Sequence, residues 1–304
     1  MSTTFPQGHQ AARPSASVIL EFFKPVTWFP PMWAFACGVI SSGITVVGNG
    51  WMIFAGVLLA GPMVCATSQA VNDWYDRDVD AINQPERPIP SGRLPGQWGW
   101  YLALLWTALS LLLATVLGPV GFAAAAVGLV LAWAYSAPPF RFKQNGWIGN
   151  TAVGLSYEGL PWITGAAVML GGQAPAIPVL MLALLYSVGA HGIMTLNDFK
   201  SIKGDRRLGI DSIPASLGVA RAARCACLFM AVPQVIVVMQ LNAWGQGTHA
   251  IAVLVLLVIQ VAMMIRFLAK PAERALWYSA FGVILFVSGM MISAFAVRGL
   301  DVAM

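Results

Sequence analysis

The chain of 304 residues is 58% hydrophobic and only 10% charged, and its mean hydropathy is +0.74. This composition excludes an ordinary soluble domain, in which about a quarter of the residues are charged, and it predicts an integral membrane protein. The formal net charge of +5 arises from basic loops and gives no reason to expect nucleic acid as a partner.

Residues 1–17 form a polar N-terminal segment in which Arg13 is the one Lys or Arg residue. The segment lacks the small-residue cleavage site of a signal peptide, so we expect no cleavage here. We expect a disordered tail over these residues and a single membrane domain over residues 18–304.

Apolar runs recur along that domain, each near the roughly 20 residues that cross a bilayer as a helix. They predict an all-α membrane bundle of nine transmembrane helices. An Asn-Asp pair recurs four helices apart, at Asn72-Asp73 and at Asn197-Asp198, and indicates a weak internal duplication. The duplication divides the bundle into two four-helix halves followed by a last helix. The expected helices cover residues 26–46, 51–71, 98–117, 119–137, 147–168, 176–196, 224–243, 248–268 and 277–297.

The basic residues give the orientation of this bundle. With the helices placed as above, every Lys and Arg except Arg298 falls on one side of the membrane. Because basic loops stay in the cytoplasm, we expect the N-terminus to be cytoplasmic and the C-terminus to lie on the opposite side.

An acidic cluster ends the second expected helix. Asp73, Asp76 and Asp80 are spaced i, i+3 and i+7, so they share one face of a helix, and Asn72 precedes them. Like charges this close repel one another unless a cation neutralises them. Mg²⁺ prefers such oxygen ligands and typically bridges carboxylates to substrate phosphates. The alternative is a solvated, charged loop after a membrane helix.

Two further polar segments follow. The fourth expected helix ends at Tyr135, and two prolines stiffen the loop that leads to Lys143. The sixth ends in a second Asn-Asp pair that includes Asp198, with Asp205 on the same face if the helix continues. An even number of crossings separates the two acidic clusters, so both lie on the same side of the membrane.

Two facing carboxylate sets with nearby Arg and Lys would bind a metal-bound anion that carries several phosphate oxygens. The chain has no glycine-rich phosphate loop, so metal and side chains would hold the phosphates. The apolar interior below the clusters favours a long hydrocarbon. A polyisoprenyl diphosphate has both parts.

These motifs resemble the signature motifs of a known family. The pattern Asn72-Asp73-x-x-Asp76-x-x-x-Asp80 is similar to the first signature of the UbiA superfamily of intramembrane prenyltransferases, and Asp198 with Asp205 is similar to the second. Within the superfamily, the chain most resembles the branch of chlorophyll and bacteriochlorophyll synthases. The segments that carry this resemblance are Asn72–Asp80, Arg87–Arg93, Tyr135–Pro139, Tyr157–Trp162, Gly189–Thr195 and Asn197–Ser201.

The chain also departs from the superfamily pattern. Ser201 stands where many members have a further Asp, and Lys203 stands where Glu is usual. The second metal set then has two carboxylates, which makes Asp211 a candidate for an additional one.

The resemblance implies a UbiA-type bundle in a bacterial inner membrane, with a periplasmic C-terminus. It implies esterification of the bacteriochlorophyllide a propionate with a geranylgeranyl or phytyl group from its diphosphate. Alternatives are chlorophyllide a or an aromatic acceptor. Membrane lipid, and pigment-binding or late biosynthetic membrane proteins, are candidate partners. The implied catalytic residues are Asn72, Asp73, Asp76, Asp80, Asp198 and Asp205. The five aspartates of this set would hold Mg²⁺. The residues implied to bind the diphosphate are Tyr135, Arg87, Lys143 and Lys203.

Two ionisable residues lie inside expected membrane helices, where such groups are costly and usually functional. Glu158 is in the fifth helix, and His191 lies seven residues before Asp198 on the same face. One hypothesis is that they contact the pigment, with His191 as an axial ligand to its magnesium or as a donor to a ring substituent. The alternative is a hydrogen bond between the two side chains that locks the fifth and sixth helices together.

Functions of other classes remain open from the sequence. An ion-coupled transporter also has intramembrane charges and a pseudo-repeat, but it predicts charged residues near the midplane rather than at the cytoplasmic edge. A non-catalytic pigment carrier would bind the same macrocycle without releasing diphosphate.

Overall fold

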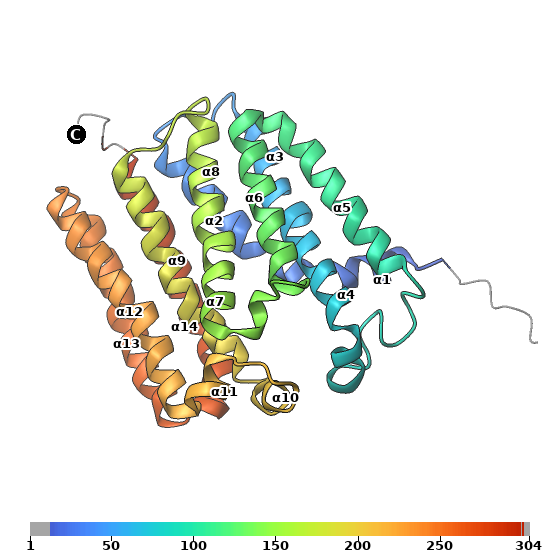
Figure 1. Cartoon of the computed structure of the whole chain (residues 1–304). Helices are drawn as coiled ribbons and strands as arrows, with labels where there is room; N and C mark the ends of the chain where they lie inside the picture. The colour runs from blue at the N-terminus through green and yellow to red at the C-terminus, as the bar shows by residue number, and fades with distance from the viewer. Residues whose placement is uncertain (1–12, 299, 301–304) are drawn as a thin grey trace, which may run out of the picture.

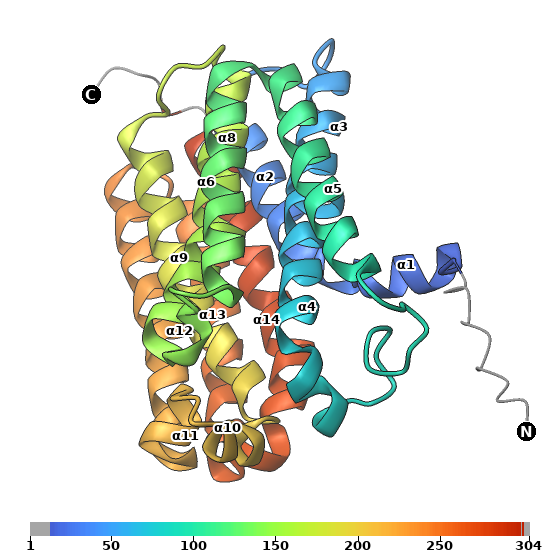
Figure 2. The ribbon, with the colours of Figure 1, turned by 45° about the vertical axis from the view of Figure 1, so that its right-hand side comes forward.

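The computed structural model of the chain describes residues 13–298 and residue 300. Over these residues the chain is helical, without strands, and most of its helices run roughly parallel to one another while α1 lies across them (Figures 1 and 2). The helices are α1 (Ala16–Phe22), α2 (Phe29–Ser41), α3 (Gly50–Leu58), α4 (Ala66–Asn83), α5 (Trp98–Ala114), α6 (Gly118–Ser136), α7 (Gly146–Gly154), α8 (Leu160–Met169), α9 (Ile177–Asp198), α10 (Ile202–Leu208), α11 (Ile213–Leu217), α12 (Val219–Ala243), α13 (Gly247–Ala269) and α14 (Pro271–Val297).

Among the described residues, six helical stretches are long and apolar enough to cross a membrane, and Phe29–Ser41 is a shorter apolar helix. This agrees with the predicted all-α membrane bundle. One of the six, Trp98–Ser136, contains both α5 and α6, which lie side by side because the chain reverses at Gly118 (Figure 1). Gly118 has φ of +75°, a conformation that glycine adopts at little cost.

Several predicted helix ends are wrong. The first helix is α2 alone, because Gly43 and Gly48 adopt positive φ in the following turn. The seventh and ninth begin at Val219 and Pro271, earlier than expected, since their first turns carry polar and charged residues that an apolar window omits. The prediction of a disordered tail over residues 1–17 is wrong for its last two residues, because α1 begins at Ala16. Residues 1–12 of that tail lie outside the described part of the chain.

Two π-helical segments, Leu59–Cys65 and Leu155–Gly159, each join two α-helices into one longer helix. The first contains Pro62, which cannot donate a backbone hydrogen bond, and Pro161 lies in the first turn of α8, which follows the second. The second expected helix therefore continues to Asn83, and its acidic cluster lies on the helix itself.

The interior of the bundle is packed around α9 and α14. Helix α9 packs against α7, α12 and α14, and α14 also packs against α2. Trp162 of α8 stacks on Tyr186 of α9, whose ring meets Phe286 of α14 edge to face. The Tyr186 hydroxyl lies 2.9 Å from that of Ser293, so this buried polar group has a partner. These contacts fix α9, which carries Asp198 at its end.

Candidate active site

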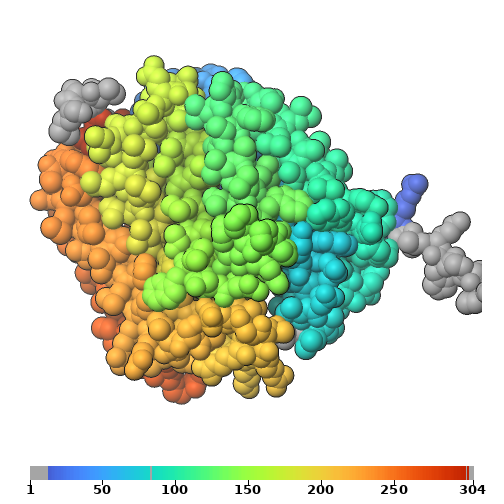
Figure 3. Space-filling view, in the orientation of Figure 1, coloured from blue at the N-terminus to red at the C-terminus, as the bar shows by residue number. Residues whose placement is uncertain are grey.

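A cavity of about 160 Å³ lies where the ends of α4, α6 and α9 meet the start of α7 and helix α10. Figure 3 shows the segment that follows α9 next to the end of α4 on this face of the molecule. The cavity therefore joins segments far apart in the sequence, and polar groups line most of it. Its lining residues are Asn72, Asp76, Tyr135, Lys143, Gly146, Gly149, Asn150, Asp198, Ser201, Asp205, Ile210 and Ser212.

Asp76 is the carboxylate on the α4 side of this cavity. Lys143, in the loop between α6 and α7, forms an ion pair with Asp76 Oδ1. The Asn72 amide donates to Asp76 Oδ2 at 2.9 Å and to the Ser136 hydroxyl at 3.3 Å. Burial lowers the pKa of Lys143, and the adjacent Asp76 carboxylate opposes that effect. The structure thus brings Asn72, Asp76 and Lys143 together as predicted.

The opposite wall carries Asp198 and Asp205. Asp198 Oδ2 accepts a hydrogen bond from Asn150 of α7 at 3.3 Å. Asp205 Oδ2 accepts bonds from the hydroxyls of Ser201 at 2.8 Å and Ser212 at 2.6 Å. The condition for a shared helix face is not met, because α9 ends at Asp198 and α10 begins at Ile202. A turn between the helices, rather than helical periodicity, brings both carboxylates to the cavity.

A parallel bridge between Asn145 and Asp211 fixes the loop that carries Lys143. The amide of Gly146 donates to the Asp211 carbonyl, and the Asp211 amide donates to the Gln144 carbonyl, each at 2.9 Å. The Asp211 residue is exposed and does not line the cavity. Its backbone, rather than its carboxylate, therefore contributes to the site.

Asp73 and Asp80 of α4 are engaged with basic side chains. Asp73 Oδ1 lies 2.5 Å from Lys24 Nζ and 3.2 Å from Arg87 Nη1, and Arg87 also bonds Asp80 at 2.6 Å. Asp73 is 2% exposed, and its Oδ2 has no hydrogen-bond partner among the described residues. Only Asp76 of the predicted row lines the cavity. Lys203 is exposed on α10 and does not line it either.

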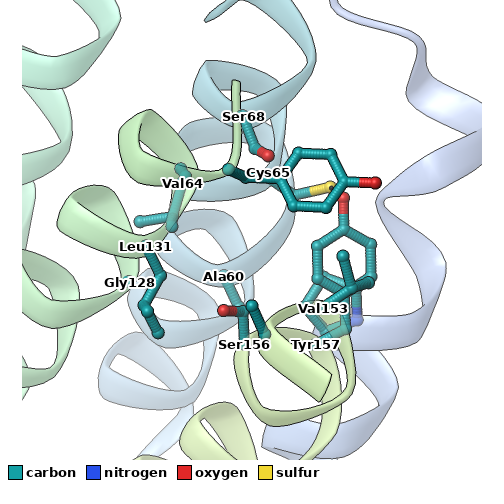
Figure 4. A pocket seen from close by; sticks show the side chains of 13 residues that line it. Ala60, Val64, Cys65, Ser68, Gly128, Leu131, Val153, Ser156 and Tyr157 are labelled. Carbon is teal, nitrogen blue, oxygen red and sulfur yellow. Dashed lines mark hydrogen bonds between the residues drawn. The ribbon is translucent and has the colours of Figure 1, made fainter. Parts of the chain in front are cut away.

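Tyr135 lines both the polar cavity and an apolar pocket below it. That pocket lies between the two π-helical segments, which contribute Val64, Cys65 and Tyr157 (Figure 4). The Tyr157 hydroxyl accepts from Gln69 at 3.0 Å and lies 3.3 Å from Cys65 Sγ, so its ring is held in place. The site thus has a polar end and an apolar end.

His191 and Glu158 lie outside the polar cavity. His191 Nδ1 is 3.2 Å from the Thr151 hydroxyl, and its ring stacks on Phe229 with centroids 4.3 Å apart. His191 Nε2 and Glu158 Oε2 are buried and unpartnered among the residues that the structure describes. The alternative of a Glu158–His191 hydrogen bond is wrong, because Nδ1 of the histidine pairs with Thr151 and its Nε2 does not bond Glu158.

Sequence reasoning missed several cavity or ion-pair residues. Asn150 gave one signal, an amide within the expected membrane helix over residues 147–168. Ser212 and Lys24 gave none, because their roles depend on partners distant in the fold: Lys24 lies 49 residues from Asp73.

The donor set of the cavity suits a magnesium ion shared with a substrate. Within residues 13–298 and 300, no three His, Cys, Asp or Glu side chains converge closely enough to enclose a metal by themselves. Mg²⁺ usually keeps several waters and binds through one or two carboxylates plus substrate phosphates. Asp76, Asp198 and Asp205 around one cavity fit that mode.

Residues 27–290 match the UbiA prenyltransferase family. The chain belongs to this family. A "Bacteriochlorophyll synthase 33 kDa chain" of Rhodobacter capsulatus is 53% identical to this UbiA protein over 95% of the chain and 96% of the relative. A chloroplastic chlorophyll synthase of Avena sativa is 40% identical over 91% of the chain and 75% of the relative.

A UbiA homologue from Archaeoglobus fulgidus, solved bound to GPP and Mg²⁺, has the same fold. It superimposes with a TM-score of 0.67 and 22% identity, covering 92% of the UbiA chain described here and 99% of its own. The family and the expected all-helical UbiA fold are therefore confirmed.

Proposed function

We propose that this UbiA prenyltransferase esterifies the propionate of bacteriochlorophyllide a with a geranylgeranyl or phytyl group and releases diphosphate. The observation that carries the proposal is the cavity that Asp76, Asp198 and Asp205 share above an apolar pocket. The name and the 53% identity of the Rhodobacter relative support the pigment as acceptor.

The diphosphate occupies the polar cavity. Asp76, Asp198 and Asp205 would hold Mg²⁺, with Asn72 and Asn150 beside them. The ion supplies Lewis-acid stabilisation of the leaving diphosphate. Lys143 contributes a positive charge beside Asp76, on the α4 side of the cavity. Arg87 orients Asp73 and Asp80 from outside the cavity. Asp73 and Asp80 therefore act by shaping the electrostatics of α4.

The reaction forms one C–O bond and breaks another. A propionate oxygen attacks C1 of the prenyl group, and the bond from C1 to the diphosphate oxygen breaks, so that the diphosphate leaves with the electron pair. Carboxylic acids of this kind have a pKa around 4, so the acceptor is already ionised near pH 7 and no general base is needed. The apolar pocket below Tyr135 excludes water from the developing allylic cation.

The membrane arrangement follows from the same helices. We propose nine crossings, with α3–α4 and α7–α8 as one crossing each, in two related four-helix halves and a last helix. The N-terminus is cytoplasmic and the C-terminus is periplasmic in a bacterial inner membrane. Ile202 of α10 packs in one cluster with Ala275 near the start of α14, whereas Arg298 follows the end of α14, and this separation supports the proposed orientation. Pigment-binding membrane proteins are the expected partners.

An assay with purified protein in lipid nanodiscs tests this function. It combines bacteriochlorophyllide a, chlorophyllide a or an aromatic acid with each diphosphate, in Mg²⁺ or in chelator. We expect pigment ester and diphosphate in equal amounts, with bacteriochlorophyllide a preferred, and no turnover in chelator. Pigment binding without diphosphate release would show a carrier instead, and transfer to the aromatic acid alone would identify a different acceptor.

A further inference from the structure

We propose that Gly128 of α6 sets the length of prenyl chain that the enzyme accepts. The inference rests on the proposed function, because it assigns the apolar pocket to the tail of the prenyl diphosphate.

The polar cavity and the two apolar pockets follow one another along α6, because neighbouring ones share lining residues. Tyr135 lines both the cavity and the first pocket, so it marks the entrance. Ala60, Val64, Gly128 and Ser156 line both the first pocket and a second, deeper one (Figure 4). A chain that leaves the diphosphate must therefore pass Gly128 to reach the second pocket.

Helix α6 provides a scale along this path. From Tyr135 to Gly128 the helix rises about 10.5 Å, and from Tyr135 to Gly121, at the far end of the second pocket, it rises about 21 Å. Three extended backbone bonds cover about 3.5 Å, so the four chain bonds of an isoprene unit cover about 4.7 Å. Two units thus cover about 9.4 Å and end near the level of Gly128, and four cover about 18.8 Å and end near that of Gly121. Geranylgeranyl and phytyl chains both have four.

The absence of a side chain at Gly128 keeps the path open. A Cβ atom at this position would lie 3.3 Å from Val64 Cγ1 and 3.5 Å from Leu160 Cδ2. These are ends of side chains rather than backbone, so a methyl group is tolerated but leaves less space between them. The two pockets are narrow, about 30 and 50 Å³, so an entering chain must displace such side chains. A bulky residue at position 128 would fill the space that they vacate.

The test compares donors of one to four isoprene units, from dimethylallyl to geranylgeranyl diphosphate, with full-length enzyme in nanodiscs. For Gly128→Phe we expect kcat/KM with the three- and four-unit donors to fall about tenfold or more relative to the two-unit donor. Gly128→Ala should give a smaller shift in the same direction. Binding of the unreactive thiolodiphosphates of each length should follow the same order.

Val127→Phe is the matched control, since Val127 is 50% exposed on the same helix and faces away from the pockets. It should leave the length preference unchanged. An equal loss for all donors in Gly128→Phe, or an unchanged preference, would overturn the inference. If the wild-type protein transferred no prenyl group to a pigment, the proposed function would fail, while thiolodiphosphate binding would still test the role of Gly128.

Discussion

Each carboxylate near the cavity has a distinct set of partners, and these partners separate its role from those of its neighbours. Asp76 and Asp198 line the cavity with an amide beside each, and Lys143 of the cavity wall pairs with Asp76. Asp73 and Asp80 lie outside the cavity and pair with Lys24 and Arg87. Residues of one sequence motif therefore divide into one that lines the cavity and two that basic side chains bind outside it.

The first prediction concerns Asp76. Asp76→Asn removes a charge at the cavity while keeping the shape of the side chain, so turnover should fall at least about a hundredfold. Asp78→Asn is the control, because Asp78 is exposed on the same helix and does not line the cavity. Pigment ester formation measures both. Turnover near the wild-type level in Asp76→Asn, with the helical circular dichroism intact, would contradict the site.

The second prediction concerns His191, whose buried Nε2 has no partner within the described part of the chain. If that nitrogen binds the macrocycle, His191→Phe should raise the KM for bacteriochlorophyllide and leave the KM for the diphosphate unchanged. His249→Phe, on α13, serves as the control. An unchanged pigment KM in a folded His191→Phe protein would remove this role.

Some of the site could be predicted from the sequence, because some of it depends on local spacing. The acidic row on α4 follows from helical periodicity, and Asp198 follows from the second motif. The ion pair of Lys143 with Asp76 joins residues 67 apart and depends on how α6 and α7 pack. The pairing of Asp73 with Lys24 is equally nonlocal, so no spacing rule could have indicated it.

At the scale of the elements, the two π-helical segments shape the apolar pocket below the cavity. Both line it, and one carries Tyr157, which Gln69 holds in place. Apolar runs predicted helices here but could not reveal the π-helical turns, since hydrophobic composition does not distinguish a π-helical turn from an α-helical one. The true starts of α12 and α14 were missed for a different reason, because their first turns carry polar and charged residues that a search for apolar runs leaves out.

The third prediction concerns the contact between α12 and α13. Gln234 and Gln260 are fully buried and exchange two amide hydrogen bonds of 2.9 and 3.2 Å. Gln260→Leu leaves the Gln234 amide without this partner and should lower the free energy of unfolding by about 1 kcal/mol. The double variant Gln234→Leu/Gln260→Leu should recover part of that loss.

Unfolding in detergent at increasing denaturant measures this effect, with Val261→Leu as a lipid-facing control on α13. The single variant Gln234→Leu completes the set. If the loss of unfolding free energy in the double variant equalled the sum of the losses in Gln234→Leu and Gln260→Leu, the amide pair would not be a coupled unit.

At the scale of the whole molecule, the bundle brings the ends of α4 and α9 to one place. Trp162, Tyr186 and Phe286 fix α9 against α8 and α14, and the bridge at Asp211 fixes the loop with Lys143. This convergence is needed for the proposed catalysis, because a metal-bound diphosphate must be contacted at once from the α4 side and from the α9 side of the cavity.

The most direct measurement of that claim is a double-mutant cycle across the cavity. Mg²⁺-dependent binding of geranylgeranyl thiolodiphosphate is measured for the wild type, Asp76→Asn, Asp198→Asn and the double variant. If both carboxylates hold one metal-bound diphosphate, each single change should remove most of the binding energy, and the double change should cost much less than the sum. Strictly additive losses would mean that the two carboxylates act at separate sites, and would contradict the account.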